Sequence, residues 1–128
     1  MSRLVLDSGA LIALERDDRA LWAALKLAAL RSTDVLVPST ALAQVWRGTT
    51  RQTRLGRALQ HCVVAAFDPL AREVGELCGR TTTSDICDAH VALVAARQGE
   101  ALYTSDPDDL GRLLAAVGGR RPIVVVRC

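Results

Sequence analysis

Aromatic residues are scarce in this chain, and that scarcity limits how its core can be built. Only four occur among 128 residues, whereas half of all residues are hydrophobic. The core must therefore consist mainly of Ala, Leu and Val, and aliphatic packing of this kind suits helices placed against a sheet. The length predicts one domain, residues 1–128, that is large enough to bury a core.

Cysteine pairs and long apolar runs are also missing, which excludes several protein classes. The four cysteines are Cys62, Cys78, Cys87 and Cys128. They contain no CxxC pair, so we expect reduced thiols rather than a disulfide framework. The longest near-apolar run, residues 20–30, is interrupted by Lys26 and is too short to span a bilayer. Asp7 breaks the first apolar run, so a signal peptide is not expected. These features predict a cytoplasmic protein without membrane contact.

Basic and acidic residues nearly balance, at 16 against 14, and a net charge of +2 does not by itself identify a nucleic-acid partner. Lys26 is the one lysine, and guanidinium groups favour bidentate contacts to phosphates and carboxylates. Four arginines recur at helical spacing: Arg47, Arg51, Arg54 and Arg57. They form either a stripe that faces phosphates or a solvated face with leucines buried behind it.

Strand-like and helix-like segments alternate along the chain, joined by short connections. Strands are expected at residues 4–6, 35–37, 63–67, 101–104 and 123–126. Helices are expected at residues 10–14, 19–30, 40–47, 51–60, 70–80 and 85–97, with a last helix ending at 117. This order predicts an α/β fold of three layers, with a central, mostly parallel sheet flanked by helices.

Aspartates occur where these strands end and where helices begin. Asp7 follows the first strand, Asp85 and Asp88 start the long helix, and Asp106 follows the fourth strand. The carboxyl ends of parallel strands meet at one edge, so we expect these acids to converge. Helix capping is the alternative role for Asp7 and for one of the two acids Asp85 and Asp88. Clustered carboxylates repel one another unless a cation neutralises them, and oxygen ligands suit Mg²⁺ or Mn²⁺.

Four segments resemble, in order, the successive motifs of a PIN-domain ribonuclease. They are residues 4–8, 39–47, 85–92 and 102–106. The short chain is similar, more narrowly, to a VapC-type toxin of a type II toxin–antitoxin pair. The resemblance extends from Leu4 to the last strand. It implies a PIN-like fold and an endoribonuclease that depends on Mg²⁺ or Mn²⁺.

The resemblance also assigns roles to individual residues. Asp7, Asp88 and Asp106 fall on the family's metal-binding aspartates, and Asp85 falls on a further catalytic acid seen in many members. The hydroxyl residues Ser8 and Ser105 would support these acids.

Gln44 stands where the family places Glu. A glutamine still offers a carbonyl oxygen, but losing a negative charge should weaken the binding of a hard cation. The outcome is reduced metal affinity with activity retained, a changed metal preference, or loss of catalysis, and we favour the first. The alternative function is a catalytically impaired PIN-like module that binds RNA or a partner without cleavage.

The expected partners are RNA and other protein chains. Arg47, Arg51 and Arg54 are expected to hold the RNA backbone, which leaves sequence choice to loops. The scarcity of aromatic rings argues against broad base stacking. The resemblance implies a homodimer and a small cognate antitoxin laid across an apolar groove, with a basic antitoxin side chain approaching the acidic pocket.

Other site types have weaker support in the sequence. A receiver or phosphatase-like site should have a lysine after a late strand, whereas Lys26 lies in an early helix, and no DxD motif follows the first strand. Cys87 and His90 have zinc-ligand spacing, but no second pair does, so we favour a core role. A Ser or Cys nucleophile lacks an elbow motif.

Overall fold

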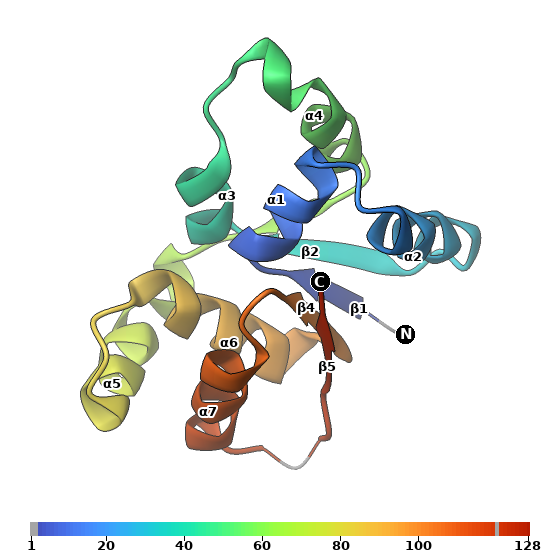
Figure 1. Ribbon diagram of the computed structural model, residues 1–128. Coiled ribbons are helices and arrows are strands. Elements are labelled where there is room, and N and C mark those ends of the chain that lie inside the picture. The colour runs from blue at the N-terminus through green and yellow to red at the C-terminus, as the bar shows by residue number, and fades with distance from the viewer. Residues whose placement is uncertain (1–2, 120) are drawn as a thin grey trace.

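The computed structural model describes residues 3–119 and 121–128, and its centre is a five-stranded sheet (Figure 1). The strands are β1 (Arg3–Leu6), β2 (Asp34–Pro38), β3 (Val63–Ala65), β4 (Ala101–Thr104) and β5 (Val124–Arg127). Their order is β3-β2-β1-β4-β5, and all four neighbouring pairs are parallel. The predicted parallel α/β architecture is therefore confirmed.

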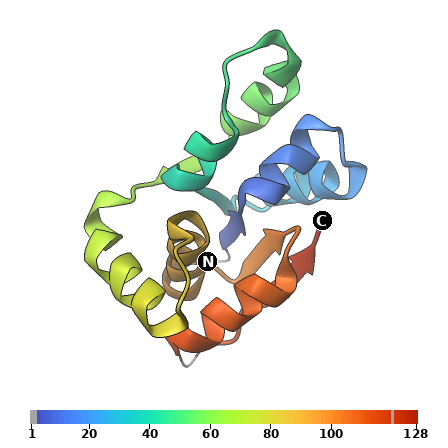
Figure 2. The same ribbon diagram turned by 60° about the vertical axis from the view of Figure 1, so that its left-hand side comes forward.

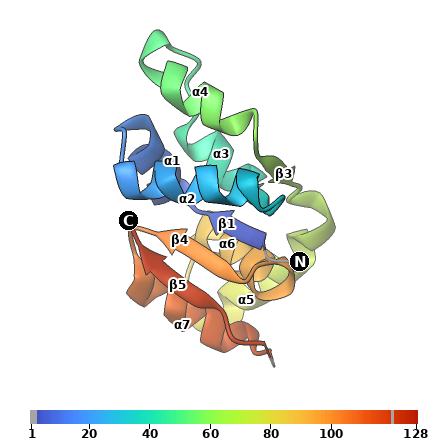
Figure 3. The same ribbon diagram turned by 90° about the vertical axis from the view of Figure 1, so that its right-hand side faces the viewer.

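Seven α-helices cover the two faces of this sheet (Figures 1 and 3). They are α1 (Ser8–Glu15), α2 (Arg19–Leu30), α3 (Ser39–Val45), α4 (Thr53–Leu59), α5 (Ala71–Thr81), α6 (Ile86–Gln98) and α7 (Pro107–Val117). The 3-10 turns η1 (Thr50–Gln52) and η2 (Asp68–Leu70) precede α4 and α5. Helices α1, α2 and α4 lie on one side and α5, α6 and α7 on the other, whereas α3 packs against both α1 and α6. The three predicted layers are present.

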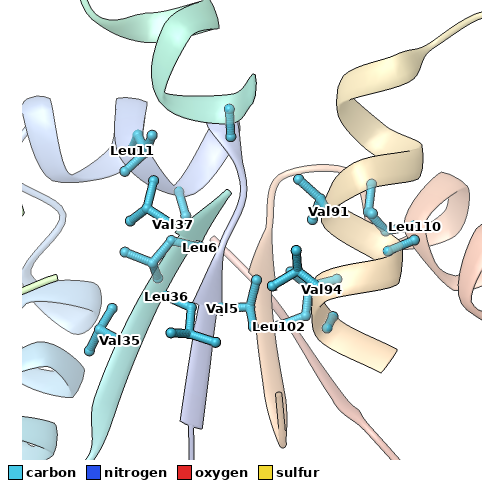
Figure 4. Close-up of a cluster of buried hydrophobic side chains, with 14 of the residues drawn as sticks. Val5, Leu6, Leu11, Val35, Leu36, Val37, Val91, Val94, Leu102 and Leu110 are labelled. Atoms are coloured by element: carbon cyan, nitrogen blue, oxygen red, sulfur yellow. The ribbon is translucent and has the colours of Figure 1, made fainter. Parts of the chain in front are cut away.

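The core is aliphatic, as the composition predicts. Val5 and Leu6 of the central strand β1 are fully buried. Val91 and Val94 of α6 approach one face of the sheet, whereas Leu11 of α1 packs on the opposite side (Figure 4). Every residue of α6 from 89 to 95 is buried, which explains its continuous apolar sequence. This packing fixes the start of α6 against the carboxyl edge of the sheet.

Several element boundaries differ from the sequence prediction. The helix expected at 40–47 ends at Val45, and the helix expected at 51–60 begins as η1 and continues as α4. Between them the chain passes through Gly48, whose φ of +72° favours glycine. The strand expected at 63–67 ends at Ala65. Beyond it, the amide of Phe67 donates to the hydroxyl of Ser39 at 3.1 Å instead of extending the ladder.

Within the described ranges, each helix is too short or too polar to cross a bilayer.

Candidate active site

Asp7 and Asp106 lie at the same edge of the sheet because they follow the paired strands β1 and β4. The amide of Asp7 donates to the carbonyl oxygen of Tyr103 at 3.2 Å, which continues the ladder to this edge. Asp7 is buried, and its Oδ1 caps α1 by accepting from the amide of Ala10 at 2.8 Å. The capping and the site interpretations of Asp7 are therefore compatible.

The buried hydroxyl of Thr104 connects these two acids. It accepts a hydrogen bond from the amide of Asp106 at 2.9 Å and lies close enough to the carboxylate of Asp7 to lower the pKa of that acid. Burial nevertheless raises the pKa of Asp7, with the nearby charge of Asp106 acting in the same direction. The Thr104 hydroxyl and the amides at the start of α1 oppose that shift.

The first turn of α6 supplies the other two predicted acids. Asp85 caps the helix, because its Oδ1 accepts from the amide of Asp88 at 2.9 Å. Burial raises the pKa of Asp88 to about 7, with further contributions from the neighbouring Asp85 and from the charges of Asp7 and Asp106. The predicted acids therefore lie close enough to interact through their charges.

A fifth acid, Asp109, also belongs to this group. It lies in the first turn of α7, and the neighbouring carboxyl of Asp106 raises the pKa of Asp109. The i, i+3 spacing of the two residues was the signal that could have identified the contact.

The donor set suits a hard divalent cation, although it does not form a closed chelate. Across residues 3–119 and 121–128, no group of three or more His, Cys, Asp or Glu side chains is arranged to hold an ion directly. Mg²⁺ keeps several waters and often uses only one or two protein carboxylates together with substrate phosphates. A cation would also relieve the repulsion that, after burial, contributes to the raised pKa of Asp88. The acids therefore fit a hydrated ion held by one or two aspartates.

Ser8 and Gln44 meet beside the acids. The hydroxyl of Ser8 donates to Oε1 of Gln44 at 2.7 Å, so the carbonyl oxygen expected to face a metal already has a partner. The Sγ atom of Cys87 lies 4.0 Å from the same hydroxyl, and burial raises the pKa of this thiol. A raised pKa keeps Cys87 protonated, which argues against a nucleophilic role.

His90 is a core residue, as the sequence interpretation favoured. Its Nδ1 and the hydroxyl of Thr40 are 2.7 Å apart, and its ring packs edge-on against Phe67 with centroids 5.3 Å apart. The side chain is fully buried, and burial lowers the pKa of the imidazole. His90 therefore packs the first turns of α6 against Thr40 and Phe67.

The turns after β1 and β4 approach each other at Gly9 and Ser105. A Cβ atom on Gly9 would lie 2.0 Å from the Ser105 hydroxyl oxygen and 2.7 Å from its Cβ. Such distances are far inside van der Waals contact, so glycine is required here. The absence of a side chain at position 9 lets the two aspartate-bearing turns come together.

A cleft of about 790 Å³ opens beside these turns. Its lining includes Ser8, Gly9, Gln44 and Ser105 near the acids, and Glu15, Arg16, Arg47, Arg51 and Gln52 farther along. One wall is the projecting segment between α3 and α4, drawn in teal and green in Figure 2. Ser8 and Ser105 are chain neighbours of Asp7 and Asp106, so the acidic edge lies beside this cleft, although no aspartate of the described residues lines it.

Gln52 holds this wall in place, and it is a residue that the sequence interpretation missed. Only 5% of it is exposed. Its Oε1 accepts from the amides of Arg47 at 2.7 Å and Gly48 at 3.1 Å, and its Nε2 donates to the carbonyl of Val45 at 2.8 Å and to Oε1 of Glu15 at 2.9 Å. A glutamine in an arginine-rich segment resembles a surface residue, and Gly48 was the one nearby sign of a tight loop.

Comparisons with known proteins identify the architecture. No protein-family model and no curated protein matches the sequence. Among solved structures, the chain matches one in the crystal structure of VapBC2 from Rickettsia felis bound to a DNA fragment from their promoter. The TM-score is 0.70 over 98% of each chain, at 15% sequence identity. The chain has a PIN-like fold. At this identity, the match establishes the fold alone.

The three arginines expected to bind RNA lie in two different environments. Arg47 and Arg51 line the cleft, and Nη1 of Arg47 also donates to the carbonyl oxygen of Trp46 at 2.7 Å. Arg54 instead connects α4 to the end of α1: its Nη1 donates to the carbonyl oxygen of Glu15 at 2.9 Å, and its Nε lies 3.8 Å from Oδ1 of Asp17. Arg51 lies in η1, whereas Arg54 lies in the following helix α4.

Proposed function

We propose that this protein is a divalent-metal-dependent endoribonuclease and the toxin of a type II toxin–antitoxin pair. The observation that carries the proposal is the gathering of Asp7, Asp85, Asp88 and Asp106 beside an arginine-lined cleft, where burial and the neighbouring acids raise the pKa of Asp88 to about 7. Concentrated negative charge beside a surface suited to phosphates is the arrangement expected of metal-dependent phosphodiester cleavage. The PIN-like fold supports the same assignment.

Asp7, Asp88 and Asp106 would hold Mg²⁺ or Mn²⁺, partly through water. When bound, such an ion polarises a phosphate oxygen and lowers the pKa of a coordinated water. Asp85 uses Oδ1 to cap α6, which leaves its second oxygen to accept a hydrogen bond from the attacking water. Thr104 keeps Asp7 and Asp106 in fixed relation, and Ser8 and Ser105 border the reacting phosphate.

Arg47 and Arg51 would hold the RNA backbone along the cleft. Guanidinium groups bind phosphate oxygens through two parallel hydrogen bonds, which positions a strand without reading its sequence. Arg54 was included in this group from its spacing. Because its guanidinium bonds to the end of α1, we assign it to holding the cleft wall, and an RNA contact by Arg54 stays a prediction.

The alternative is a PIN-like module that binds RNA or a protein partner without cleaving RNA. Gln44 favours it, since a neutral side chain engaged by Ser8 contributes less to a metal site than a carboxylate would.

Metal-dependent cleavage of a structured RNA separates the two functions. The wild-type protein should cut with Mg²⁺ or Mn²⁺ and not with EDTA, and Asp88→Asn should abolish cutting. Asp34→Asn is the matched control, because Asp34 begins β2 at the opposite end of the sheet and pairs with Arg3. RNA binding without cleavage under every metal condition would favour the alternative.

An antitoxin and a second copy of the chain are the proposed protein partners, and the cytoplasm is the proposed location. Helix α2 exposes apolar surface, including Leu27 and Leu30, the latter 77% exposed. An apolar pocket of about 450 Å³ lies beside it, lined by Trp22, Leu25 and Ala58 among others. An apolar antitoxin segment would cover this surface and bring a basic side chain to the aspartates. Light scattering that finds only monomer at micromolar concentration would contradict the homodimer.

A further inference from the structure

Glu15 presents a carboxylate to the arginine-lined cleft without entering an ion pair among the described residues. The ion pairs of the described residues involve instead Asp17, Asp34 and Glu73, none of which lines the cleft. The contact recorded for the Glu15 carboxylate is the neutral amide of Gln52, whose Nε2 donates to Oε1 at 2.9 Å. Because Gln52 is buried and fixed by three backbone groups, it holds this carboxylate in one orientation.

Holding the loop does not by itself require a carboxylate at position 15. Three of the four hydrogen bonds of Gln52 go to the backbone of residues 45, 47 and 48. A neutral acceptor would satisfy the remaining N–H equally well, without placing a negative charge in a cleft that is meant to receive RNA. The charge at Glu15 is therefore left without a structural explanation.

An oriented carboxylate selects bases by their hydrogen-bond donors. Its two oxygens have about four acceptor positions, and Gln52 occupies one of them. Guanine is the RNA base whose Watson–Crick edge carries two adjacent donors, N1–H and the N2 amino group. Single-stranded RNA exposes these edges for recognition by side chains.

We propose, building on the ribonuclease function above, that Glu15 binds the Watson–Crick edge of a guanine next to the cleaved linkage. Gln52 is the positioning residue that holds Glu15. Helix α1 begins at Ser8 beside the acids and ends at Glu15, and seven residues of helical rise place the two about 10 Å apart. The guanine therefore belongs to a nucleotide close to the reacting phosphate.

Other cleft residues suit the rest of that nucleotide. Ile12 and Val45 give apolar surface for the flat face of the base, and Arg47 and Arg51 lie where flanking phosphates would pass. Guanine selection by a carboxylate also requires no aromatic stacking partner, which agrees with the scarcity of aromatic residues in the chain.

The test measures RNA binding in EDTA, where metal-dependent cleavage cannot occur. Fluorescence anisotropy compares labelled uridine-rich octamers that carry a single central guanine, inosine, adenine, cytosine or uracil. The wild-type protein should bind the guanine octamer about tenfold more tightly than the adenine, cytosine and uracil octamers. Inosine lacks the N2 amino group and should fall between them.

Glu15→Gln is the decisive variant. Its amide oxygen still accepts from Gln52, but an NH₂ group replaces the second acceptor, so the guanine preference should disappear without loss of affinity for the all-uridine octamer. Glu76→Gln, on the exposed face of α5, removes the same charge away from the cleft and should preserve the preference. Thermal melting should show that both variants are folded.

Equal wild-type affinity for all five octamers overturns the inference, as does a guanine preference that survives Glu15→Gln. Metal-dependent cleavage together with base-independent binding defeats this inference alone. A guanine preference that Glu15→Gln abolishes, in a protein that cleaves no RNA with any metal, defeats the nuclease assignment and leaves the guanine site in place. No binding of any octamer overturns this inference, and the nuclease assignment is then decided by the cleavage assay alone.

Discussion

The hydroxyl of Ser8 donates a hydrogen bond to Oε1 of Gln44 across 2.7 Å, beside the clustered aspartates. This contact ties the start of α1 to α3 at the mouth of the cleft. It also uses one of the two acceptor positions of Oε1, the Gln44 atom that is chemically suited to a divalent cation. The side chain at position 44 therefore shapes the site, while adding no charge to it.

Gln44→Glu should tighten Mg²⁺ binding. A carboxylate can accept the same hydrogen bond from Ser8 and has a second, charged oxygen for the ion or its water. Isothermal titration of Mg²⁺ into the two proteins measures the difference. Unchanged or weaker affinity in the variant would place residue 44 outside the surroundings of the metal.

Asp88→Asn should stabilise the metal-free protein, and more so at higher pH. Folding raises the pKa of Asp88 from 3.8 to about 7, so the folded state holds a proton that the unfolded state releases in between. The resulting penalty on wild-type stability is absent below pH 3.8, grows as the pH rises, and is complete above about 7. Urea unfolding at pH 5 and pH 8 should show the larger gain for the variant at pH 8. An equal gain at both values would contradict the raised pKa.

Gly9→Ala should destabilise the protein and separate the two aspartate-bearing turns. The added methyl group collides with Ser105 and costs about 1–3 kcal/mol, as overpacking typically does. Cleavage should fall as well, because Asp7 and Asp106 follow these turns. Gly75→Ala is the control. Gly75 lies in α5, where an added Cβ would have nothing within 4 Å, so this variant should raise the free energy of unfolding by about 0.5–1 kcal/mol. Thermal melting and a cleavage assay together check both expectations.

Arg51→Ala and Arg54→Ala should have different effects, although their spacing in the sequence suggests one role. Arg51 lines the cleft, so its removal should weaken RNA binding. The slope of log affinity against log salt concentration should fall by about one, the value for one lost phosphate contact. Arg54 bonds to the end of α1, so its removal should lower the free energy of unfolding by about 0.5–1.5 kcal/mol. Anisotropy at several salt concentrations and urea unfolding measure these quantities. If the two variants reduce the salt dependence of RNA binding equally, Arg51 and Arg54 do not have separate roles.

The order of the elements and the meeting of the acids could be predicted from the sequence. Helix α2 has its predicted bounds because Asp18 caps it, its Oδ1 accepting from the amide of Leu21 at 3.0 Å. Asp7 and Asp106 meet because they lie one and two residues beyond the paired parallel strands β1 and β4, which end at one edge. The capping residue and the strand ends that carry these predictions lie within a few residues of the helix or side chain that they position.

The tertiary structure alone decided how the cleft wall is held and which arginines face it. The hydrogen bond between Gln52 and Glu15 joins residues 37 positions apart, and no local pattern marks it. Likewise, Thr104 can connect Asp7 with the amide of Asp106 only once β1 and β4 have paired. Periodicity and capping act along the chain, so the sequence determined the elements and their common edge. Single side-chain contacts depend on how those elements pack in space, so only the folded chain could decide them.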